Sequence, residues 1–87
     1  MTVVLIPSQL QSYTGGASRV EADGRTVMDL LRDLDRQFPG IRFRVVDEQD
    51  RVRQHMKIFI GPERVADLNT PMTAGRDLML FGALSGG

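Results

Sequence analysis

The sequence contains no cysteine and only one histidine among its 87 residues. Without cysteine the chain can form no disulfide framework, no zinc knuckle and no cysteine-ligated iron–sulfur cluster. The single histidine, His55, leaves no convincing Ser–His–Asp or Cys–His catalytic set. We therefore expect His55 to be a surface residue, and we expect neither a metal site nor catalytic chemistry of the chain's own.

A charge excess of either sign and a long apolar segment are also lacking. Eleven basic residues balance eleven acidic ones, which predicts no nucleic-acid partner and no binding to an anionic membrane. The longest apolar runs, 3–6 and 78–81, have the length of strands and are far too short to span a bilayer. The N-terminus lacks the basic segment of a secretory signal, so we expect a cytoplasmic location.

The residues that are present predict one small domain that begins with a hairpin. A run of β-branched and apolar residues at 2–7 is typical of a strand. Tyr13-Thr14-Gly15-Gly16 supplies glycines for a turn, and a second strand over about 17–22 stops at the turn pair Asp23-Gly24.

A helix is expected next, with Thr26 as its N-cap and Asp29 three residues later. Apolar side chains recur at i, i+3, i+4, i+7 and i+11, which makes one apolar stripe: Val27, Leu30, Leu31, Leu34 and Phe38. Pro39-Gly40 ends the helix. The acidic residues of this helix interleave with arginines, so we interpret them as surface charge pairs rather than metal ligands: Asp29, Asp33 and Asp35.

Beyond the helix the sequence predicts three further strands. Apolar residues alternate with arginines at 41–45, which is the period of a strand: Ile41, Phe43 and Val45. A strand returns through about 52–60, and the last one spans 78–81. Residues 61–64 are expected to turn the chain and 65–76 to be irregular.

Four arginines gather around the turn expected at 47–50 and form a candidate site for phosphate or an acidic partner: Arg42, Arg44, Arg51 and Arg53. Three acidic residues lie among them: Asp47, Glu48 and Asp50. Local neutralisation therefore favours a solvated hairpin over a ligand site. The glycines form neither a phosphate-binding loop nor a dinucleotide fingerprint.

The element order is β-β-α-β-β-β, and it predicts an α+β fold. One helix cannot cover both faces of a sheet, so a mixed sheet of four to five strands with the helix across one face is the simplest architecture. This is the β-grasp, or ubiquitin-like, arrangement. The domain is expected to span 1–81. A flexible tail follows it: Gly82, Ala83, Leu84, Ser85, Gly86 and Gly87.

Two phenylalanines are expected on the sheet face that the helix leaves open. Phe59 and Phe81 lie opposite their apolar strand neighbours, and exposed aromatic side chains on a sheet can form a partner-docking surface. The alternative for Phe59 is that a loop such as 65–74 covers it.

Several motifs follow one another in the order of the elements: Tyr13-Thr14-Gly15-Gly16, Gly24 with Thr26-Val27, Phe38-Pro39-Gly40, Gly75 with Asp77, and Ser85-Gly86-Gly87. With the β-grasp pattern and the chain length, they resemble the ThiS/MoaD family of ubiquitin-like sulfur carriers over essentially the whole chain. The early Thr-Gly-Gly and the Pro-Gly after the helix lean towards the cysteine-biosynthesis branch. Phe81-Gly82-Ala83 stands where many relatives have a proline, which argues against molybdopterin synthase.

The resemblance implies that the Gly87 carboxylate is the reactive group. An E1-like enzyme would adenylate it with ATP, and a thiocarboxylate would form and donate sulfur to a biosynthetic enzyme for cysteine, thiamin, molybdopterin or a secondary metabolite. The chain would bind no cofactor and act as a co-substrate rather than an enzyme. The residues that would enter the partner's active site are small or apolar: Gly82, Ala83, Leu84, Ser85 and Gly86.

Two alternatives remain open at this point. A ubiquitin-like protein modifier would use the same activation and then form isopeptide bonds through Gly87. A passive interaction module would bind a partner through its sheet, and its tail would be inert.

Overall fold

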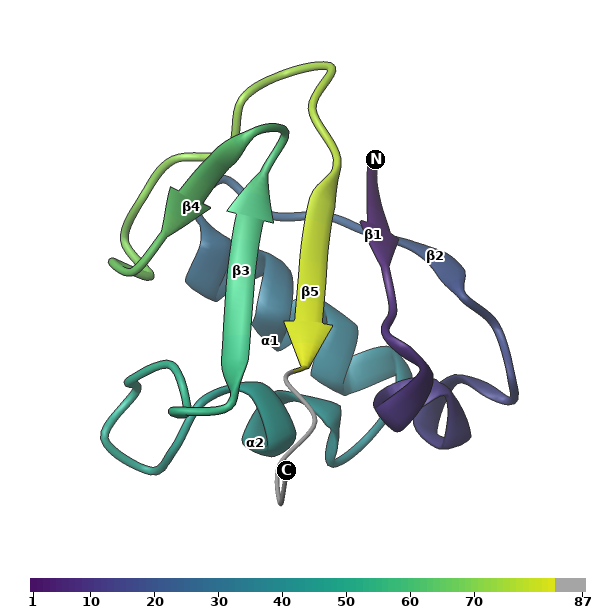
Figure 1. Ribbon diagram of the computed structural model, residues 1–87. Coiled ribbons are helices and arrows are strands. Elements are labelled where there is room, and N and C mark those ends of the chain that lie inside the picture. The colour runs from purple at the N-terminus through teal and green to yellow at the C-terminus, as the bar shows by residue number, and fades with distance from the viewer. Residues whose placement is uncertain (83–87) are drawn as a thin grey trace.

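The computed structural model describes residues 1–82, which form one sheet with a helix packed across its back (Figure 1). In chain order the elements are β1 (Thr2–Leu5), the 3-10 helix η1 (Ser8–Thr14), β2 (Arg19–Ala22), α1 (Val27–Gln37), α2 (Ile41–Val45), β3 (Met56–Ile60), β4 (Glu63–Val65) and β5 (Leu78–Gly82). No helix in this part of the chain is long and apolar enough to cross a membrane.

The sheet is mixed and has the strand order β2-β1-β5-β3-β4. The central strand β5 runs parallel to its neighbour β1, and every other neighbouring pair is antiparallel. α1 covers one face only, as Figure 1 shows. The predicted β-grasp fold is therefore confirmed.

α1 forms as the sequence predicts. The Asp29 N–H donates to the Thr26 hydroxyl over 3.1 Å, which caps the first turn. The apolar stripe faces the sheet, and Leu30, Leu31 and Leu34 are completely buried. Burying each of these leucines contributes about 1.5–3 kcal/mol. The packing of α1 on the sheet therefore holds the domain together.

The strand predicted over 41–45 is wrong: these residues form the short helix α2. Gly40 takes a left-handed conformation with φ 98°, and the Asp35 carboxylate accepts 3.1 Å hydrogen bonds from the N–H groups of Gly40 and Arg42. Ile41 and Val45 are buried one helical turn apart, while Phe43 between them is 54% exposed. A strand would have placed all three on one face.

The remaining differences concern short segments. Residues 8–14 form η1, an element that the sequence did not predict, and 63–65 form β4 where the end of a turn and the start of irregular chain were expected. Residues 52–55 precede β3 and are not part of it. β5 continues one residue farther than predicted and includes Gly82. Ala83, Leu84, Ser85, Gly86 and Gly87 lie outside the described residues.

Candidate functional site

Phe59 and Phe81 lie side by side on the face of the sheet opposite α1, as predicted. Strand alternation places Met56, Ile58 and Ile60 of β3 in the core and turns Phe59 outwards. The two rings meet edge to face, with centroids 5.5 Å apart and planes at 88°. Phe81 is 48% exposed, and Phe59 is half-buried beside it.

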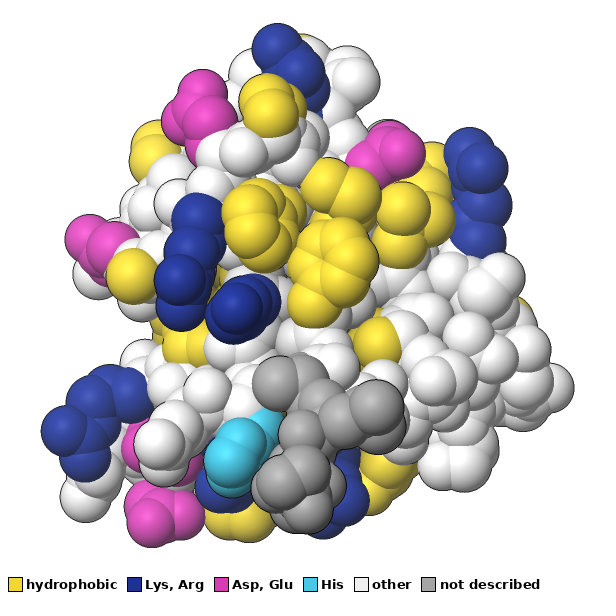
Figure 2. Space-filling view, in the orientation of Figure 1, with side chains coloured by type: hydrophobic (Ala, Val, Ile, Leu, Met, Phe, Trp, Pro, Cys, Tyr) yellow, Lys and Arg dark blue, Asp and Glu magenta, His cyan; other side chains and the backbone are white. Residues whose placement is uncertain are grey.

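The two rings line an open groove of about 490 Å³, which we call the sheet-face groove: Lys57, Phe59, Gly61, Pro62, Met79, Phe81 and Gly82. The 65–74 loop contributes no residue to it, so the alternative of a loop-covered Phe59 does not hold here. Figure 2 shows hydrophobic side chains gathered over the centre of this face, with Lys and Arg side chains at their border.

Strand register explains the basic border. Lys57 pairs with Phe81 across β3 and β5, and Arg64 of β4 pairs with Phe59. Paired residues point to the same side of a sheet, so both cations stand next to the rings. A complementary surface would be apolar at its centre and acidic at its rim.

The groove reaches the point where the described chain ends. Gly82 lines the groove, and it pairs with Met56 as the last residue of β5. Its carbonyl oxygen also accepts a 2.8 Å hydrogen bond from the Gln9 side-chain amide. The structure thus brings together Phe59, Phe81 and Gly82 of the predicted site residues.

Sequence reasoning missed the other residues of the site. Met79 could have been found, because the alternation that turned Phe81 outwards places Met79 on the same face. Gln9 carried no signal, because its contact with Gly82 spans 73 positions of sequence.

Known proteins of the same size match the chain over nearly its full length. The sulfur carrier protein CysO of Mycobacterium tuberculosis is 30% identical over 89 residues, which cover 97% of this chain and 96% of that protein. The chain belongs to the ThiS/MoaD family of ubiquitin-like sulfur carriers. No protein-family profile matches the sequence.

Solved structures agree with membership of the ThiS/MoaD family. A chain of the Amycolatopsis orientalis BexX/CysO complex matches with a TM-score of 0.91 and 30% identity, over 100% of both chains. Mycobacterium tuberculosis CysO matches with a TM-score of 0.90 and 27% identity, over 97% of this chain and 100% of that one. SAMP1 of Haloferax volcanii matches with a TM-score of 0.77 and 29% identity, over 99% and 98%.

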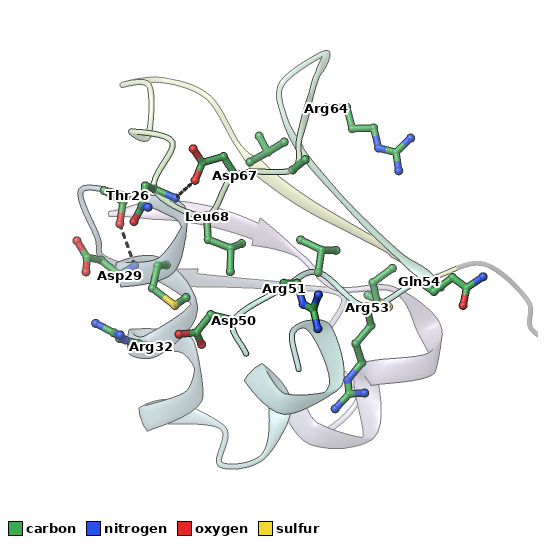
Figure 3. A pocket seen from close by; sticks show the side chains of 16 residues that line it. Thr26, Asp29, Arg32, Asp50, Arg51, Arg53, Gln54, Arg64, Asp67 and Leu68 are labelled. Atoms are coloured by element: carbon green, nitrogen blue, oxygen red, sulfur yellow. Dashed lines mark hydrogen bonds between the residues drawn. The ribbon is translucent and has the colours of Figure 1, made fainter. Parts of the chain in front are cut away.

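A second depression in this ThiS/MoaD domain is larger and polar. It has a volume of about 750 Å³ and lies between the start of α1, the 50–54 segment and the 64–69 segment (Figure 3). Its lining carries both signs of charge: Asp29, Arg32, Asp50, Arg51, Arg53, Arg64 and Asp67. Mixed charge of this kind favours neither an anion nor a cation.

Most of the arginines predicted to gather around the 47–50 turn are engaged within the chain. Arg42 lies 3.3 Å from the Asp50 carboxylate, and Arg51 lies 3.8 Å from that of Asp47. Arg53 donates to the Phe43 carbonyl over 2.7 Å, and its guanidinium lies 4.6 Å from the centre of the Phe43 ring. The predicted neutralisation is observed. A single antiparallel bridge between Val46 and Val52 closes the turn, although α2 and not a strand precedes it.

The other polar candidates have structural surroundings. His55 is exposed, as predicted. In residues 1–82, no three His, Cys, Asp or Glu side chains lie close enough to hold a metal ion. Asp35 fixes the start of α2, and Asp33 accepts hydrogen bonds from the Asp23 N–H and the Gln37 amide.

Acid is expected to weaken the domain through Asp33. The hydrogen bond from the Asp23 N–H, with the Arg36 charge and the Gln37 amide, outweighs partial burial and holds the pKa of the Asp33 carboxyl below its ordinary value of 3.8. A lowered native pKa stabilises the fold above pH 3.8, and this stabilisation is lost as the pH falls through the native pKa.

The Asp33→Asn variant should therefore show a shallower acid-dependent loss of unfolding free energy than the parent. Urea unfolding between about pH 5 and pH 2 measures it. Asp47, whose pKa is lowered chiefly by the Arg51 N–H, supplies an independent variant, Asp47→Asn, with the same expected direction. Equal slopes in the parent and both variants would contradict the assignment.

Proposed function

We propose that the chain is a sulfur carrier whose Gly87 carboxylate is activated by an E1-like enzyme and converted to a thiocarboxylate. The observation that carries the proposal is the sheet-face groove, which lies beside Gly82 with five residues left before the terminal carboxylate. Membership of the ThiS/MoaD family and full-length similarity to CysO support it. The chain itself serves as a co-substrate and binds no cofactor.

The chemistry explains why activation is needed. A carboxylate is a poor electrophile, because its charge is delocalised and its leaving group would be oxide. In the proposed reaction the Gly87 carboxylate attacks the α-phosphate of ATP and pyrophosphate leaves. A sulfur nucleophile then displaces AMP from the acyl-adenylate. Because the chain has no cysteine, it cannot carry the sulfur as a persulfide, and the terminal carbonyl carbon is left as the acceptor.

Intact-mass measurement tests this proposal. The chain, the E1-like enzyme of the source organism, ATP and a sulfide donor are incubated together. The expected result is replacement of one oxygen by sulfur, located on Gly87 by fragmentation. Incubation without ATP is the control. A chain that stays unmodified while the enzyme activates another carrier of the same host would refute the proposal.

The sheet-face groove is the proposed docking surface for the enzyme. Phe81 is the more exposed of the two rings and adjoins Gly82. Aromatic side chains at the centre of an interface often cost more than 1 kcal/mol when truncated, and some cost 2 kcal/mol or more. A partner with an apolar centre and acidic side chains near Lys57 and Arg64 fits this surface.

Truncation of Phe81 should weaken docking without unfolding the domain. Phe81→Ala is expected to raise the KM for adenylation by about 10-fold or more, with a smaller effect on kcat. Phe43→Ala is the matched control, because Phe43 is similarly exposed but lies on α2, outside the groove. Steady-state pyrophosphate exchange measures both variants. Equal KM values for the two would rule out docking through Phe81.

A second candidate function is protein modification through Gly87. The similarity to the small archaeal modifier protein SAMP1 favours it specifically. This function predicts Gly-Gly remnants on lysines of other proteins, which mass spectrometry of a digest from the source organism detects. The two functions share the activation step, so isopeptide products would add to the carrier role rather than replace it.

A further inference from the structure

The side chain of Gln9 reaches across the molecule to the end of β5. Its Nε2 donates a hydrogen bond to the carbonyl oxygen of Gly82 over 2.8 Å, although the two residues are 73 positions apart. Gly82 is the last described residue before 83–87. The contact therefore lies where the segment that carries the proposed reactive carboxylate begins.

Strand pairing explains why a side chain is needed there. β1 accompanies β5 only at two positions, where Val4 pairs with Leu78 and Leu5 with Met79. The chain then departs from β5, while the Ile6 N–H still bonds to the Ser18 carbonyl on the β2 side. From Leu80 onwards β5 has no paired strand on this side. The Gln9 amide supplies at Gly82 a donor that a longer β1 would have supplied.

The element that carries Gln9 is fixed to the core. The next residue, Leu10, is buried, with only 3% of its surface exposed. The Gln11 side chain donates to the Ile6 carbonyl over 3.1 Å, which ties η1 to the end of β1. Gln9 itself is exposed. The Gln9 side chain is thus exposed to solvent, while the helix that carries it is anchored to the core.

The same contact explains the glycine at position 82. A Cβ there would lie 2.7 Å from Nε2 of Gln9, which is closer than such atoms approach in proteins, and 3.0 Å from its Cδ. The obstruction is the far end of a flexible side chain, so a larger residue would displace Gln9 and leave the strand in place. The hydrogen bond and a side chain at position 82 therefore exclude each other.

We propose that Gln9 is a positioning residue. Its hydrogen bond to Gly82 fixes the point from which the chain continues towards the partner's active site. On its other side Gly82 lies opposite Met56 of β3. Five extended residues reach at most about 18 Å, so fraying of β5 by even one residue shifts the terminal carboxylate relative to the docked groove. Small shifts of a reacting atom lower rates steeply. This inference rests on the proposed function.

Four variants test the role of the Gln9–Gly82 hydrogen bond. Gln9→Ala removes the donor, and Gln9→Glu keeps the shape but replaces the donor with an acceptor. Gly82→Ala displaces the intact Gln9 side chain, and the fourth variant combines Gln9→Ala with Gly82→Ala. Ser12→Ala is the control, because Ser12 is an exposed residue of the same η1 helix. Backbone relaxation by NMR reports the order of β5 directly.

The expected kinetic result is a loss of kcat with little change in KM. In pyrophosphate exchange with the host's E1-like enzyme and ATP, each single variant should lower kcat by about 3- to 10-fold, the range for one neutral hydrogen bond. For the two Gln9 variants KM should stay within about twofold, because Gln9 does not line the sheet-face groove. The double variant should be no worse than either single variant, since both changes break the same contact. The residue at position 82 should become less ordered in each variant that breaks the Gln9–Gly82 bond, and it should stay ordered in Ser12→Ala.

Three results would overturn the proposed positioning role of Gln9. They are normal kcat in Gln9→Glu, unchanged order of Gly82 in Gln9→Ala, or independent losses that multiply in the double variant. Failure of the proposed function looks different, because the parent chain itself would then give no pyrophosphate exchange. In that event the NMR comparison still decides whether Gln9 holds Gly82.

Discussion

Deleting Gly87 is expected to abolish adenylation and thiocarboxylate formation while leaving the fold intact. The shortened chain would end about 3.5 Å sooner, the length of one extended residue. A misplacement of about 1 Å at a reacting atom can already cost about 100-fold in rate. Because β5 ends at Gly82, the deletion removes no residue of the sheet. Pyrophosphate exchange and intact mass measure the loss of activity, and thermal unfolding measures the fold.

The deletion also separates chemistry from docking. The sheet-face groove is untouched in the shortened chain, so this variant should inhibit the full-length chain competitively, with an inhibition constant close to the parent's KM. Combining the deletion with Phe81→Ala should remove the inhibition. A shortened chain that still accepted sulfur would show that the reactive group is elsewhere. If the chain that lacks only Gly87 did not inhibit, Gly87 itself would contribute part of the binding energy for the enzyme.

The sequence predicted those elements whose signals are local. α1 is an example, because its apolar spacing and its Thr26 cap are contained within the helix. The open face of the sheet was also predictable, since alternation along β3 and β5 turns Phe59 and Phe81 to one side. These patterns were sufficient to place the two rings of the proposed docking surface on one face.

Contacts that apolar periodicity does not reveal decided the segments that the sequence did not predict. Ile41 and Val45 satisfy a strand period and a helical i, i+4 spacing equally well. The Asp35 carboxylate and the left-handed Gly40 select the helix. β4 has only three residues and forms through pairing with β3. The Gln9–Gly82 bond joins opposite ends of the chain, so no window of sequence contains it.

The fold itself should be most sensitive at Gly24, where β2 turns back towards α1. A Cβ at this position would lie 2.3 Å from the Leu30 backbone nitrogen and 2.7 Å from the Asp29 carbonyl carbon. These atoms belong to the backbone of α1, so no rotamer change can relieve the overlap. Gly24→Ala must push the helix away from the sheet, and Leu30, Leu31 and Leu34 would lose their close packing.

The expected cost of Gly24→Ala is about 3 kcal/mol, the upper end for overpacking in a core. A domain of this size would then unfold roughly 12–24 °C lower, at about 4–8 °C per kcal/mol. Gly75→Ala is the matched control, because its φ of 80° strains an alanine but no atom lies within 4 Å of the added Cβ. That strain costs about 1–2 kcal/mol. If thermal unfolding gave both variants the same midpoint, the approach of Gly24 to α1 would be looser than described. A clear difference between the two midpoints would instead measure how rigidly α1 is held against the sheet that carries the sheet-face groove.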